Sequence, residues 1–328
     1  MRKYILVTGS SGFIGFHLCK RLLKSNKNFN IIGVDNMNSY YDLKLKIDRL
    51  KILKKHKNFI FFKYDLEDFI KLNNLFKKFK IEKVINLAAQ AGVRNSIYDP
   101  DTYFKYNVNG FYNILKLCVN FQIKHLVYAS SSSVYGSSTK YPFNEQIDTS
   151  SPKSFYAATK KMNEVMAHSF SEIYGLKVSG MRFFTVYGPY GRPDMSLYKF
   201  IEAIFNKKEI ELFNNGNHFR DFTYIDDCID GIILVLNRKM QNFHKHEIFN
   251  IGNGNSRPLN LFLDKIIEST NNRKVKIKKL GMQLGDVYKT HSSIKKINKI
   301  NNFKPKYSIE MGIKLFIDWY TKYHSIKN

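Results

Sequence analysis

Length, composition and charge narrow the class of protein. The chain has 328 residues, 44% of them hydrophobic and 15% aromatic, which excludes a disordered chain and fits a globular one. No apolar run approaches the roughly 20 residues that cross a bilayer, so we expect no membrane contact. The cysteines lie far apart and form no CxxC pair, so neither a disulfide framework nor a metal site is indicated and a cytoplasmic protein is expected: Cys19, Cys118 and Cys228.

The formal net charge of +26 does not by itself indicate a nucleic-acid partner. Proteins that bind nucleic acid usually cluster their basic residues, whereas these lysines are scattered among asparagine and isoleucine through the whole chain. We therefore expect no nucleic-acid binding. A generally positive field still favours anionic small molecules.

Short apolar strands alternate with longer helical patterns in the first half of the chain. Strands are predicted at 4–8, 30–34, 59–64, 83–87, 125–130 and 176–182. Helices are predicted at 13–25, 43–56, 68–79, 103–121 and 155–174. This alternation predicts an α/β fold with a doubly wound, Rossmann-type parallel sheet.

The second half reads differently, because glycine, proline and asparagine interrupt shorter segments after about residue 186. Residues 1–186 are predicted to form the main domain, and 187–328 mainly a smaller C-terminal lobe. Segments within about 220–251 are expected to return to the main domain. Two such lobes would share one interface and enclose a cleft.

The segment YILVTGSSGFIG at 4–15 places a buried strand directly before a glycine-rich turn and a helix. Gly9 permits the tight turn, Gly12 lets backbone N–H groups approach a pyrophosphate, and Gly15 lets the helix press against the strand. The helix begins at Phe13 and Ile14, so its N-terminus faces the phosphates. This placement predicts a dinucleotide cofactor.

Asp35 ends the second strand, 20 residues beyond Gly15, where a carboxylate can accept hydrogen bonds from ribose hydroxyls. It would repel a 2′-phosphate, so NAD is favoured over NADP; a simple turn aspartate is the alternative. The residues after this and the next two strands are further candidates for cofactor contacts: Asn36, Asp65, Leu66, Leu87, Ala88 and Ala89.

The fifth strand runs into the serine cluster SSSSVYG at 130–136, and the next helix carries Tyr156 and Lys160 one turn apart on one face. Oxidising a secondary alcohol requires removal of its hydroxyl proton, and free tyrosine, with a pKa of about 10, is weakly ionised at neutral pH. A nearby lysine cation, helped by the positive nicotinamide ring, would favour the phenolate, so Tyr156 becomes a usable general base. A serine of the cluster can hold the reacting oxygen.

These motifs together resemble the extended short-chain dehydrogenase/reductases over nearly the whole chain. The resemblance is closest to the nucleotide-sugar 4-epimerases, above all the UDP-glucuronate 4-epimerases, and is carried by NLAAQAGVR at 86–94, MRFFTVYGP at 181–189, GRPDM at 191–195, RDFTYIDD at 220–227 and MQLGDV at 282–287. It implies an NAD-binding domain in the first half and a substrate-binding lobe in the second.

The resemblance implies that Tyr156 is the catalytic base, Lys160 its modulator and Ser131 the assisting hydroxyl, a role that Ser132 or Ser133 could share. The implied reaction is C4 epimerisation of a UDP-sugar, most simply UDP-glucuronate to UDP-galacturonate. It proceeds by transient hydride transfer to tightly held NAD through a 4-keto intermediate. The implied role is supply of precursors for capsule or lipopolysaccharide.

The resemblance also places substrate contacts. Arg220 corresponds to an arginine that grips the UDP diphosphate, with a surface ion pair to Asp221 as the alternative. Many galactose-type epimerases carry a second arginine where this chain has Gln283, as the uronate type tends to, and Asp286 shortly after it is a further substrate-binding candidate. The other candidates at the sugar end and cleft are Arg94, Ser132, Ser133, Thr185 and Arg192, of which Arg192 has loop anchoring as its alternative.

Several alternatives share these motifs. UDP-N-acetylglucosamine or UDP-glucose could be the sugar nucleotide, and a UDP-glucuronate decarboxylase would share the first half-reaction. A 4,6-dehydratase needs an Asp-Glu pair where this chain has Ser132 and Ser133, so dehydration is disfavoured. A non-catalytic NAD-binding protein remains the alternative of a different class.

The resemblance also implies a homodimer through helices 103–121 and 155–174, although apolar residues there could face the chain's own core.

Overall fold

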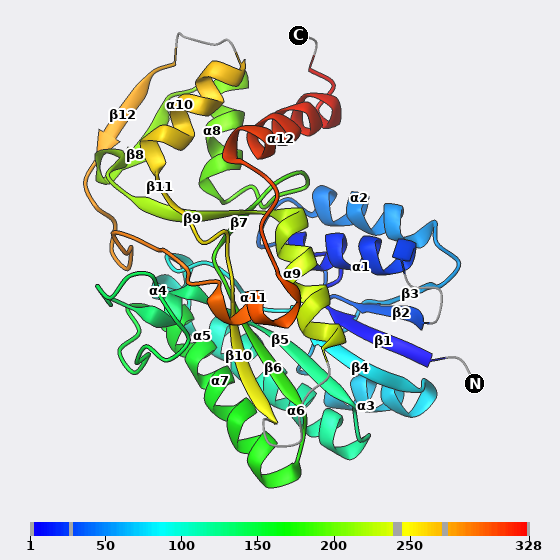
Figure 1. Cartoon of the computed structure of the whole chain (residues 1–328). Coiled ribbons are helices and arrows are strands. Elements are labelled where there is room, and N and C mark those ends of the chain that lie inside the picture. Colours follow the sequence, from blue (N-terminus) through cyan, green and yellow to red (C-terminus); the bar gives the residue numbers. More distant parts are fainter. Residues whose placement is uncertain (1–2, 26–28, 239–244, 271–274, 327–328) are drawn as a thin grey trace.

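The centre of the molecule is a seven-stranded parallel sheet with strands in the order β10-β6-β5-β4-β1-β2-β3 (Figure 1). The computed structural model describes residues 3–25, 29–238, 245–270 and 275–326. The strands are β1 Lys3–Thr8, β2 Phe29–Val34, β3 Phe59–Phe62, β4 Ile81–Asn86, β5 His125–Ser131, β6 Val178–Phe183 and β10 His246–Ile251. The predicted α/β doubly wound sheet is confirmed. From β1 the strands are added first on one side, as β2 and β3, and then on the other, as β4, β5 and β6, and such folds bind ligands at the point between β1 and β4 where this order switches.

Helices cover both faces of this sheet (Figure 1). One face carries α1 Phe13–Ser25, α2 Leu43–Lys54 and α9 Ile225–Asn237, and the other carries α3 Phe69–Lys78, α6 Gly110–Asn120 and α7 Phe155–Tyr174. Side chains along β1 alternate accordingly: Ile5 and Val7 belong to the cluster under α1, and Leu6 belongs to the opposite cluster.

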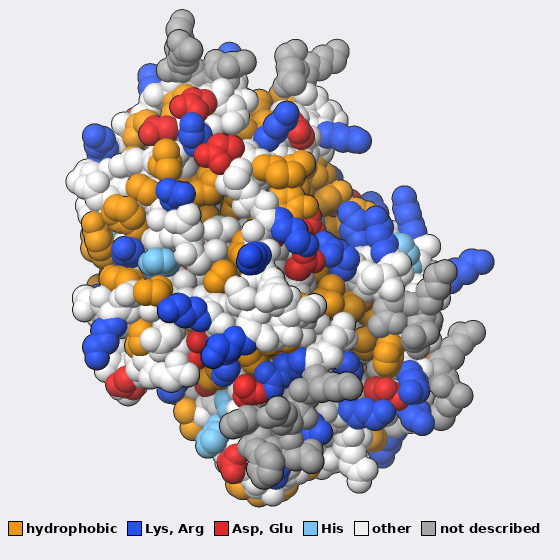
Figure 2. All heavy atoms as spheres, viewed as in Figure 1, with side chains coloured by type: hydrophobic (Ala, Val, Ile, Leu, Met, Phe, Trp, Pro, Cys, Tyr) orange, Lys and Arg blue, Asp and Glu red, His pale blue; other side chains and the backbone are white. Residues whose placement is uncertain are grey.

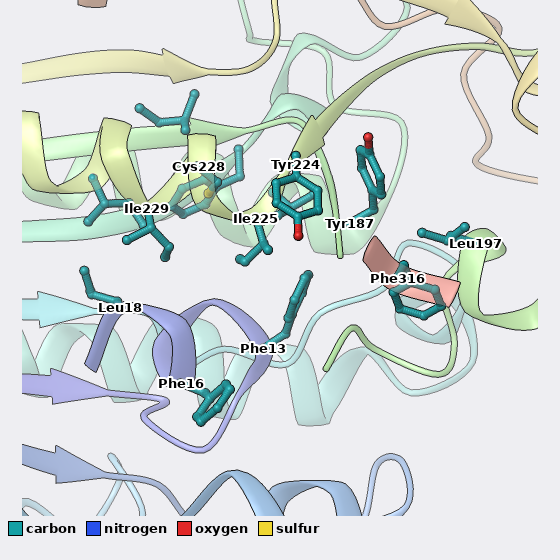
Figure 3. Packing of buried hydrophobic residues seen from close by; sticks show 14 of the residues in the cluster. Phe13, Phe16, Leu18, Tyr187, Leu197, Tyr224, Ile225, Cys228, Ile229 and Phe316 are labelled. Carbon is teal, nitrogen blue, oxygen red and sulfur yellow. The ribbon is translucent and has the colours of Figure 1, made fainter. Parts of the chain in front are cut away.

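The first cluster continues from the main sheet into the second half of the chain. Phe13 and Leu18 of α1 face Ile225 and Ile229 of α9, as Figure 3 shows, and the same cluster reaches Phe316. The two halves of the molecule therefore share one apolar core, which keeps their relative position fixed around any cavity between them.

The predicted helix at 103–121 has a different construction. α5 Pro100–Tyr103 is followed by a π-helical turn, Phe104–Asn109, before α6 begins. Within that turn the Asn107 side chain donates to the Gln90 carbonyl and to Thr159 Oγ1, each at 3.0 Å, and accepts from the Gln90 N–H at 2.7 Å. The wider turn thus connects the end of β4 with α7, a tertiary contact that residue periodicity does not reveal.

A buried ion pair fixes α7 against the ends of β5 and β6. The Glu164 carboxylate accepts from Arg182 Nε and Nη2, both at 2.8 Å, and from Ser130 Oγ at 2.6 Å. Both charged side chains are almost fully buried. Removing one partner of such a pair typically costs about 3–5 kcal/mol because it leaves an uncompensated charge, so α7 has little freedom to move relative to β5.

The second half of the chain builds the upper part of the molecule in Figure 1. It holds a small sheet of β7 Thr185–Tyr187, β9 Phe219–Tyr224 and β11 Ser256–Pro258, and a pair of β8 Ile210–Phe213 with β12 Ile277–Leu280. The helices around them are α8 Ser196–Phe205, α10 Leu259–Thr270 and α12 Ile309–Tyr323, whereas α11 Lys295–Asn301 packs against α9 and β10 of the main sheet. Within 220–251, β10 joins the main sheet beside β6, and 239–244 lie outside the described residues. The division at about residue 186 stays a prediction.

The surface agrees with the scattered distribution of lysines in the sequence. Lys and Arg side chains are spread over the face shown in Figure 2 and are interrupted by acidic, apolar and uncharged groups. Among the described residues, no helix has the combination of length and apolar character that spanning a bilayer requires.

Candidate active site

A cavity of about 1040 Å³ lies at the carboxyl ends of the central strands and is walled on its other side by residues of the second half. This is the upper end of the range for ligand pockets, about 300–1,000 Å³, which leaves room for more than one small molecule. The predicted cofactor residues line it: Gly9, Gly12, Phe13, Ile14, Gly15, Asp35, Asn36, Asp65, Leu66, Leu87, Ala88 and Ala89. So do the predicted catalytic and substrate residues: Arg94, Ser131, Ser132, Ser133, Tyr156, Lys160, Thr185, Arg192, Arg220 and Asp286.

The glycine turn between β1 and α1 has no room for side chains. Gly9 has φ +67°, and a Cβ there would lie 2.7 Å from the Ala88 nitrogen. A Cβ on Gly15 would overlap the Gly9 carbonyl oxygen, which also accepts the Gly12 N–H at 3.0 Å. The turn and the N-terminus of α1 therefore form a narrow backbone cradle beside the cavity, which fits the pyrophosphate of a dinucleotide.

The Asp35 carboxylate accepts hydrogen bonds from two nearby backbone N–H groups and also lines the cavity. Its carboxylate accepts from the Ser11 N–H at 3.0 Å and from the Met37 N–H at 2.9 Å. A carboxylate has further lone pairs, so these two bonds leave capacity for ribose hydroxyls. The neighbouring Asn36 donates to Asp65 at 3.2 Å, which places the ends of β2 and β3 side by side.

The three predicted catalytic residues come together at the end of β5. The Ser131 hydroxyl hydrogen-bonds to the Tyr156 phenol, and Lys160 Nζ donates to the Ala129 carbonyl at 3.1 Å. The Tyr156 N–H donates to Ser96 Oγ at 3.0 Å. The first turn of α7 is thus held to β5 on one side and to the segment after β4 on the other.

The serine cluster forms a small hydroxyl network. Ser131 Oγ lies 3.1 Å from Ser133 Oγ and accepts from the Ser133 N–H at 3.2 Å. Because a hydroxyl carries one proton, Ser131 donates to either the phenol oxygen or Ser133, and Ser133 can donate in return. Ser132 and Ser133 begin a 3-10 turn, Ser132–Tyr135, directly after β5.

Burial dominates the ionisation of both catalytic groups. It raises the pKa of Tyr156, while the hydrogen bond from Ser131 and the charge of Arg192 lower it in part. Burial also lowers the pKa of Lys160 to about 8. The prediction that a lysine cation and a positive nicotinamide ring together favour the phenolate concerns the cofactor-bound protein; in the protein alone, burial outweighs the groups that lower the pKa of Tyr156. A further positive charge at this end of the cavity is needed to favour the ionised phenol.

Arg220, on β9, lines the cavity from the side of the second half of the chain. Its Nη1 donates to the carbonyls of Phe219 at 3.0 Å and Tyr288 at 3.1 Å, and it makes no ion pair among the described residues. The alternative of an ion pair with Asp221 is wrong, because the Asp221 carboxylate is buried and accepts from Ser292 Oγ and nearby backbone N–H groups. Arg220 is therefore free to bind an anion.

Two further arginines have carboxylate partners. Arg94 lies 3.4 Å from Asp286, so this ion pair bridges the main sheet side and the late loop of the second half. Arg192 binds Asp194 through Nε at 3.0 Å and through Nη2. Arg192 thus both anchors its loop and lines the cavity, and Asp194 offsets much of the charge that it could offer a substrate carboxylate.

Sequence reasoning missed several residues that line the cavity. The segment after β2 contributes Asn38, Tyr40 and Tyr41, and α2 contributes Lys46, while His218 stands beside Arg220. Lysine and asparagine are so frequent in this chain that neither Asn38 nor Lys46 carried a signal. Only the fold, which packs α2 against the glycine turn, distinguishes Asn38 and Lys46 from the many other asparagines and lysines of the chain.

Fold and cavity together are those of a dinucleotide-binding protein with room for a second ligand. A family model described as the NAD dependent epimerase/dehydratase family matches residues 5–252, and the chain belongs to this family.

Individual relatives are similar over nearly the full length. The chain is 42% identical to a UDP-glucuronate 4-epimerase of Thermodesulfobacterium geofontis, covering 96% of this chain and 95% of that one. It is 41% identical to UDP-glucuronate 4-epimerase 4 of Arabidopsis thaliana, over 98% of this chain and 76% of that one. The crystal structure of UDP-glucuronic acid 4-epimerase from Bacillus cereus, with UDP-glucuronic acid and NAD, superposes with a TM-score of 0.92 at 30% identity, covering 98% and 99% of the two chains.

The burial of Lys160 makes a prediction about stability. Because the pKa is 10.5 in the unfolded chain and about 8 in the ligand-free fold, the unfolded chain binds more protons between these pH values, and stability from this group rises with pH there. Relative to Lys160→Met, the free energy of unfolding of the wild type should rise by about 2 kcal/mol from pH 8 to pH 10. Urea unfolding at both pH values measures this, and a constant difference would contradict the lowered pKa.

Proposed function

We propose that the protein is an NAD-dependent UDP-glucuronate 4-epimerase that interconverts UDP-glucuronate and UDP-galacturonate. The observation that carries the proposal is that one cavity joins the glycine turn, the Ser131–Tyr156 pair and the unpaired guanidinium of Arg220. Support for the uronate comes from the relatives named above and from the hydroxyl groups of Ser132, Ser133 and Thr185 at the catalytic end.

Binding is divided between the two ends of the cavity. Backbone N–H groups of the glycine turn and the α1 N-terminus would hold the cofactor pyrophosphate, and Asp35 its adenosine ribose. Arg220 would bind the UDP diphosphate, since burial lowers its pKa and an anion would satisfy its charge. These two anchors direct the sugar toward Tyr156.

The chemistry at C4 requires a proton acceptor and a fixed alcohol. NAD held there would supply the acceptor and donor for the C4 hydrogen and its electron pair, and its oxidised ring would supply the positive charge that the site lacks. The Tyr156 oxygen accepts the proton of the C4 hydroxyl and returns it once C4 has been reduced on the other face. Ser131 holds the reacting oxygen by a hydrogen bond, and Lys160 is kept beside β5 by the Ala129 carbonyl.

The alternative reactions lack specific support in the site. A dehydratase would need carboxylic acids where Ser132 and Ser133 stand. Of the carboxylates that line the described cavity, none stands in the serine turn after β5, and Asp194 is already paired with Arg192. A decarboxylase would release carbon dioxide and leave a pentose, and another UDP-sugar would be epimerised without the C6 carboxylate.

Incubation with defined substrates tests the proposal. Purified protein given UDP-glucuronate should form UDP-galacturonate without added reductant, and UDP-glucose and UDP-N-acetylglucosamine should react at least tenfold more slowly in kcat/KM. Chromatography that separates C4 epimers measures all three. A pentose product would identify a decarboxylase, and no interconversion of any UDP-sugar would reject the epimerase assignment.

Loss of the phenol oxygen should stop turnover without removing the cofactor. Tyr156→Phe is expected to lower kcat by about 10²–10⁴-fold because the general base is lost, while bound NAD per chain stays unchanged. Tyr174→Phe, at the exposed far end of α7, is the matched control and should keep full activity. Near-normal turnover by Tyr156→Phe would remove Tyr156 from its proposed role.

We also propose a homodimer through the face formed by α6 and α7. Apolar side chains there are exposed, among them Val165 at 56% and Ile173 at 69%, with Tyr112 on α6 beside them. Met166 and Phe170, in contrast, pack partly on the chain's own core. A second copy of the same face would cover the exposed groups, as the resemblance implies.

A charge on this face should separate the subunits. Val165→Asp is expected to shift sedimentation from dimer to monomer, because a carboxylate would be buried in an apolar interface. Ile70→Asp, at an exposed apolar position on α3, serves as the control and should leave the mass unchanged. A wild type that sediments as a monomer would refute the dimer.

We also propose that the protein works in the cytoplasm and supplies a polysaccharide precursor. Cys19, Cys118 and Cys228 are all buried and unpaired, which suits the reducing cytoplasm. UDP-galacturonate made there would supply polysaccharide assembly.

A further inference from the structure

The segment 188–191, between β7 and Arg192, follows a course that its own residues do not favour. Tyr190 has φ +57°, a left-handed conformation that costs a residue other than glycine about 1–2 kcal/mol. Gly188 has φ +141°, and a Cβ there would lie 2.6 Å from Ile225 Cγ2. Such a conformation persists only where surrounding groups fix it, so other parts of the chain hold this segment.

Side chains from two helices of the main sheet bind the backbone carbonyls of this segment. His17 Nε2, on α1, donates to the Pro189 carbonyl at 2.8 Å. Arg49 Nη2, on α2, donates to the next two carbonyls, of Tyr190 at 2.6 Å and of Gly191 at 3.4 Å. Neither of these two donor side chains lines the cavity. Three successive carbonyls are therefore fixed from outside the cavity.

His17 acts as a constant donor near neutral pH. Burial lowers its pKa to about 3 against the opposing effect of the Pro189 carbonyl, and three nearby cations lower it further: Lys20, Arg49 and Arg21. The neutral ring carries one N–H, and because a carbonyl oxygen only accepts, that proton lies on Nε2. The hydrogen bond to Pro189 therefore does not change across the neutral pH range.

The Tyr190 ring packs between the two halves of the chain. Its centroid lies 5.0 Å from that of Phe16 on α1 and 4.9 Å from that of Trp319 on α12. The Tyr323 ring, also on α12, lies 5.9 Å away. These contacts attach the segment to the protein independently of His17, so loss of the His17 hydrogen bond should shift the backbone rather than unfold the chain.

The segment leads directly into Arg192, whose guanidinium has one nitrogen left for a ligand. Asp194 accepts from Nε at 3.0 Å and from Nη2, and the Ala91 carbonyl lies 3.4 Å from Nη2. Nη1 makes no hydrogen bond among the described residues. Arg192 lines the cavity, and its charge acts on Tyr156 at the catalytic end. The direction of Nη1 thus depends on the course of the backbone just before it.

We propose that His17 is a positioning residue that orients Arg192 toward the acidic group of the substrate, through its hydrogen bond to the Pro189 carbonyl. The inference rests on the proposed function, because it takes that acidic group to be the C6 carboxylate of a uronate. A guanidinium displaced by about 1 Å would lose the geometry that hydrogen bonding to a carboxylate needs. His17 would thereby favour the uronate without touching it.

Calorimetry with His17→Leu tests this without relying on turnover. Dissociation constants for UDP-glucuronate, UDP-glucose, UDP and NAD are measured in a Tyr156→Phe background, where the substrate is not converted. His17→Leu should weaken UDP-glucuronate by at least tenfold and leave the other three within twofold, since only UDP-glucuronate presents a carboxylate to Arg192. His17→Gln, whose amide N–H can reach the Pro189 carbonyl, should recover most of the affinity.

His125→Leu is the matched control, because it removes a histidine whose Nε2 lies 2.9 Å from the Ser179 hydroxyl at the start of β5, the end of the strand away from the cavity. It should change no dissociation constant more than twofold. Unchanged UDP-glucuronate affinity in His17→Leu would overturn the proposal. An equal loss for UDP-glucose would do so too, because it would indicate a general disturbance of the cavity, and so would the absence of recovery in His17→Gln, which would assign the loss to packing.

Epimerisation by the wild type, measured in parallel, separates this inference from the proposed function. If the wild type interconverts the two uronates and His17→Leu keeps full affinity for UDP-glucuronate, only the positioning role fails. A wild type that binds no UDP-glucuronate would overturn both.

Discussion

The site depends on the clamp between α7 and the ends of β5 and β6. Glu164, Arg182 and Ser130 join three elements inside the core, so the first turn of α7 cannot shift relative to the strand end that carries Ser131. Asn107 adds a second tie through Thr159. With the helix fixed at both places, a phenol and an ammonium are held in a partly dry environment where their ionisation responds strongly to any charge that enters.

The second half of the chain contributes anion recognition by a different strategy. Arg220 donates hydrogen bonds to backbone carbonyls, and the carboxylate of the neighbouring Asp221 accepts hydrogen bonds from backbone N–H groups of two other loops. Those loops lead to Asp286 and its ion pair with Arg94. Groups distant in sequence therefore assemble this part of the cavity, while the glycine turn and the cofactor candidates after β2, β3 and β4 all come from the first 89 residues.

Sequence alone predicted the main sheet, and the residues that it suggested for catalysis line one cavity; the reasons for both are local. Strand and helix periods, the glycine turn and the spacing of Tyr156 and Lys160 each depend on a few neighbouring residues. Three features could not be predicted, because each arises from contacts between distant segments: the π-helical turn, the partners of Arg192 and the contribution of α2 to the cavity wall. For the ionisation of Tyr156 the sequence showed only the charges, whereas burial, a property of the whole fold, raises the pKa of the phenol.

The three cysteines have a practical consequence. Burial raises the pKa of each thiol, so at neutral pH almost none is present as the reactive thiolate. Cys19 and Cys228 lie on α1 and α9, in the packed layer that joins the two halves, and Cys118 lies on α6 under the opposite face. Alkylating reagents and mild oxidants would therefore modify this protein only when these layers separate, so thiol labelling would report the opening of each face of the sheet.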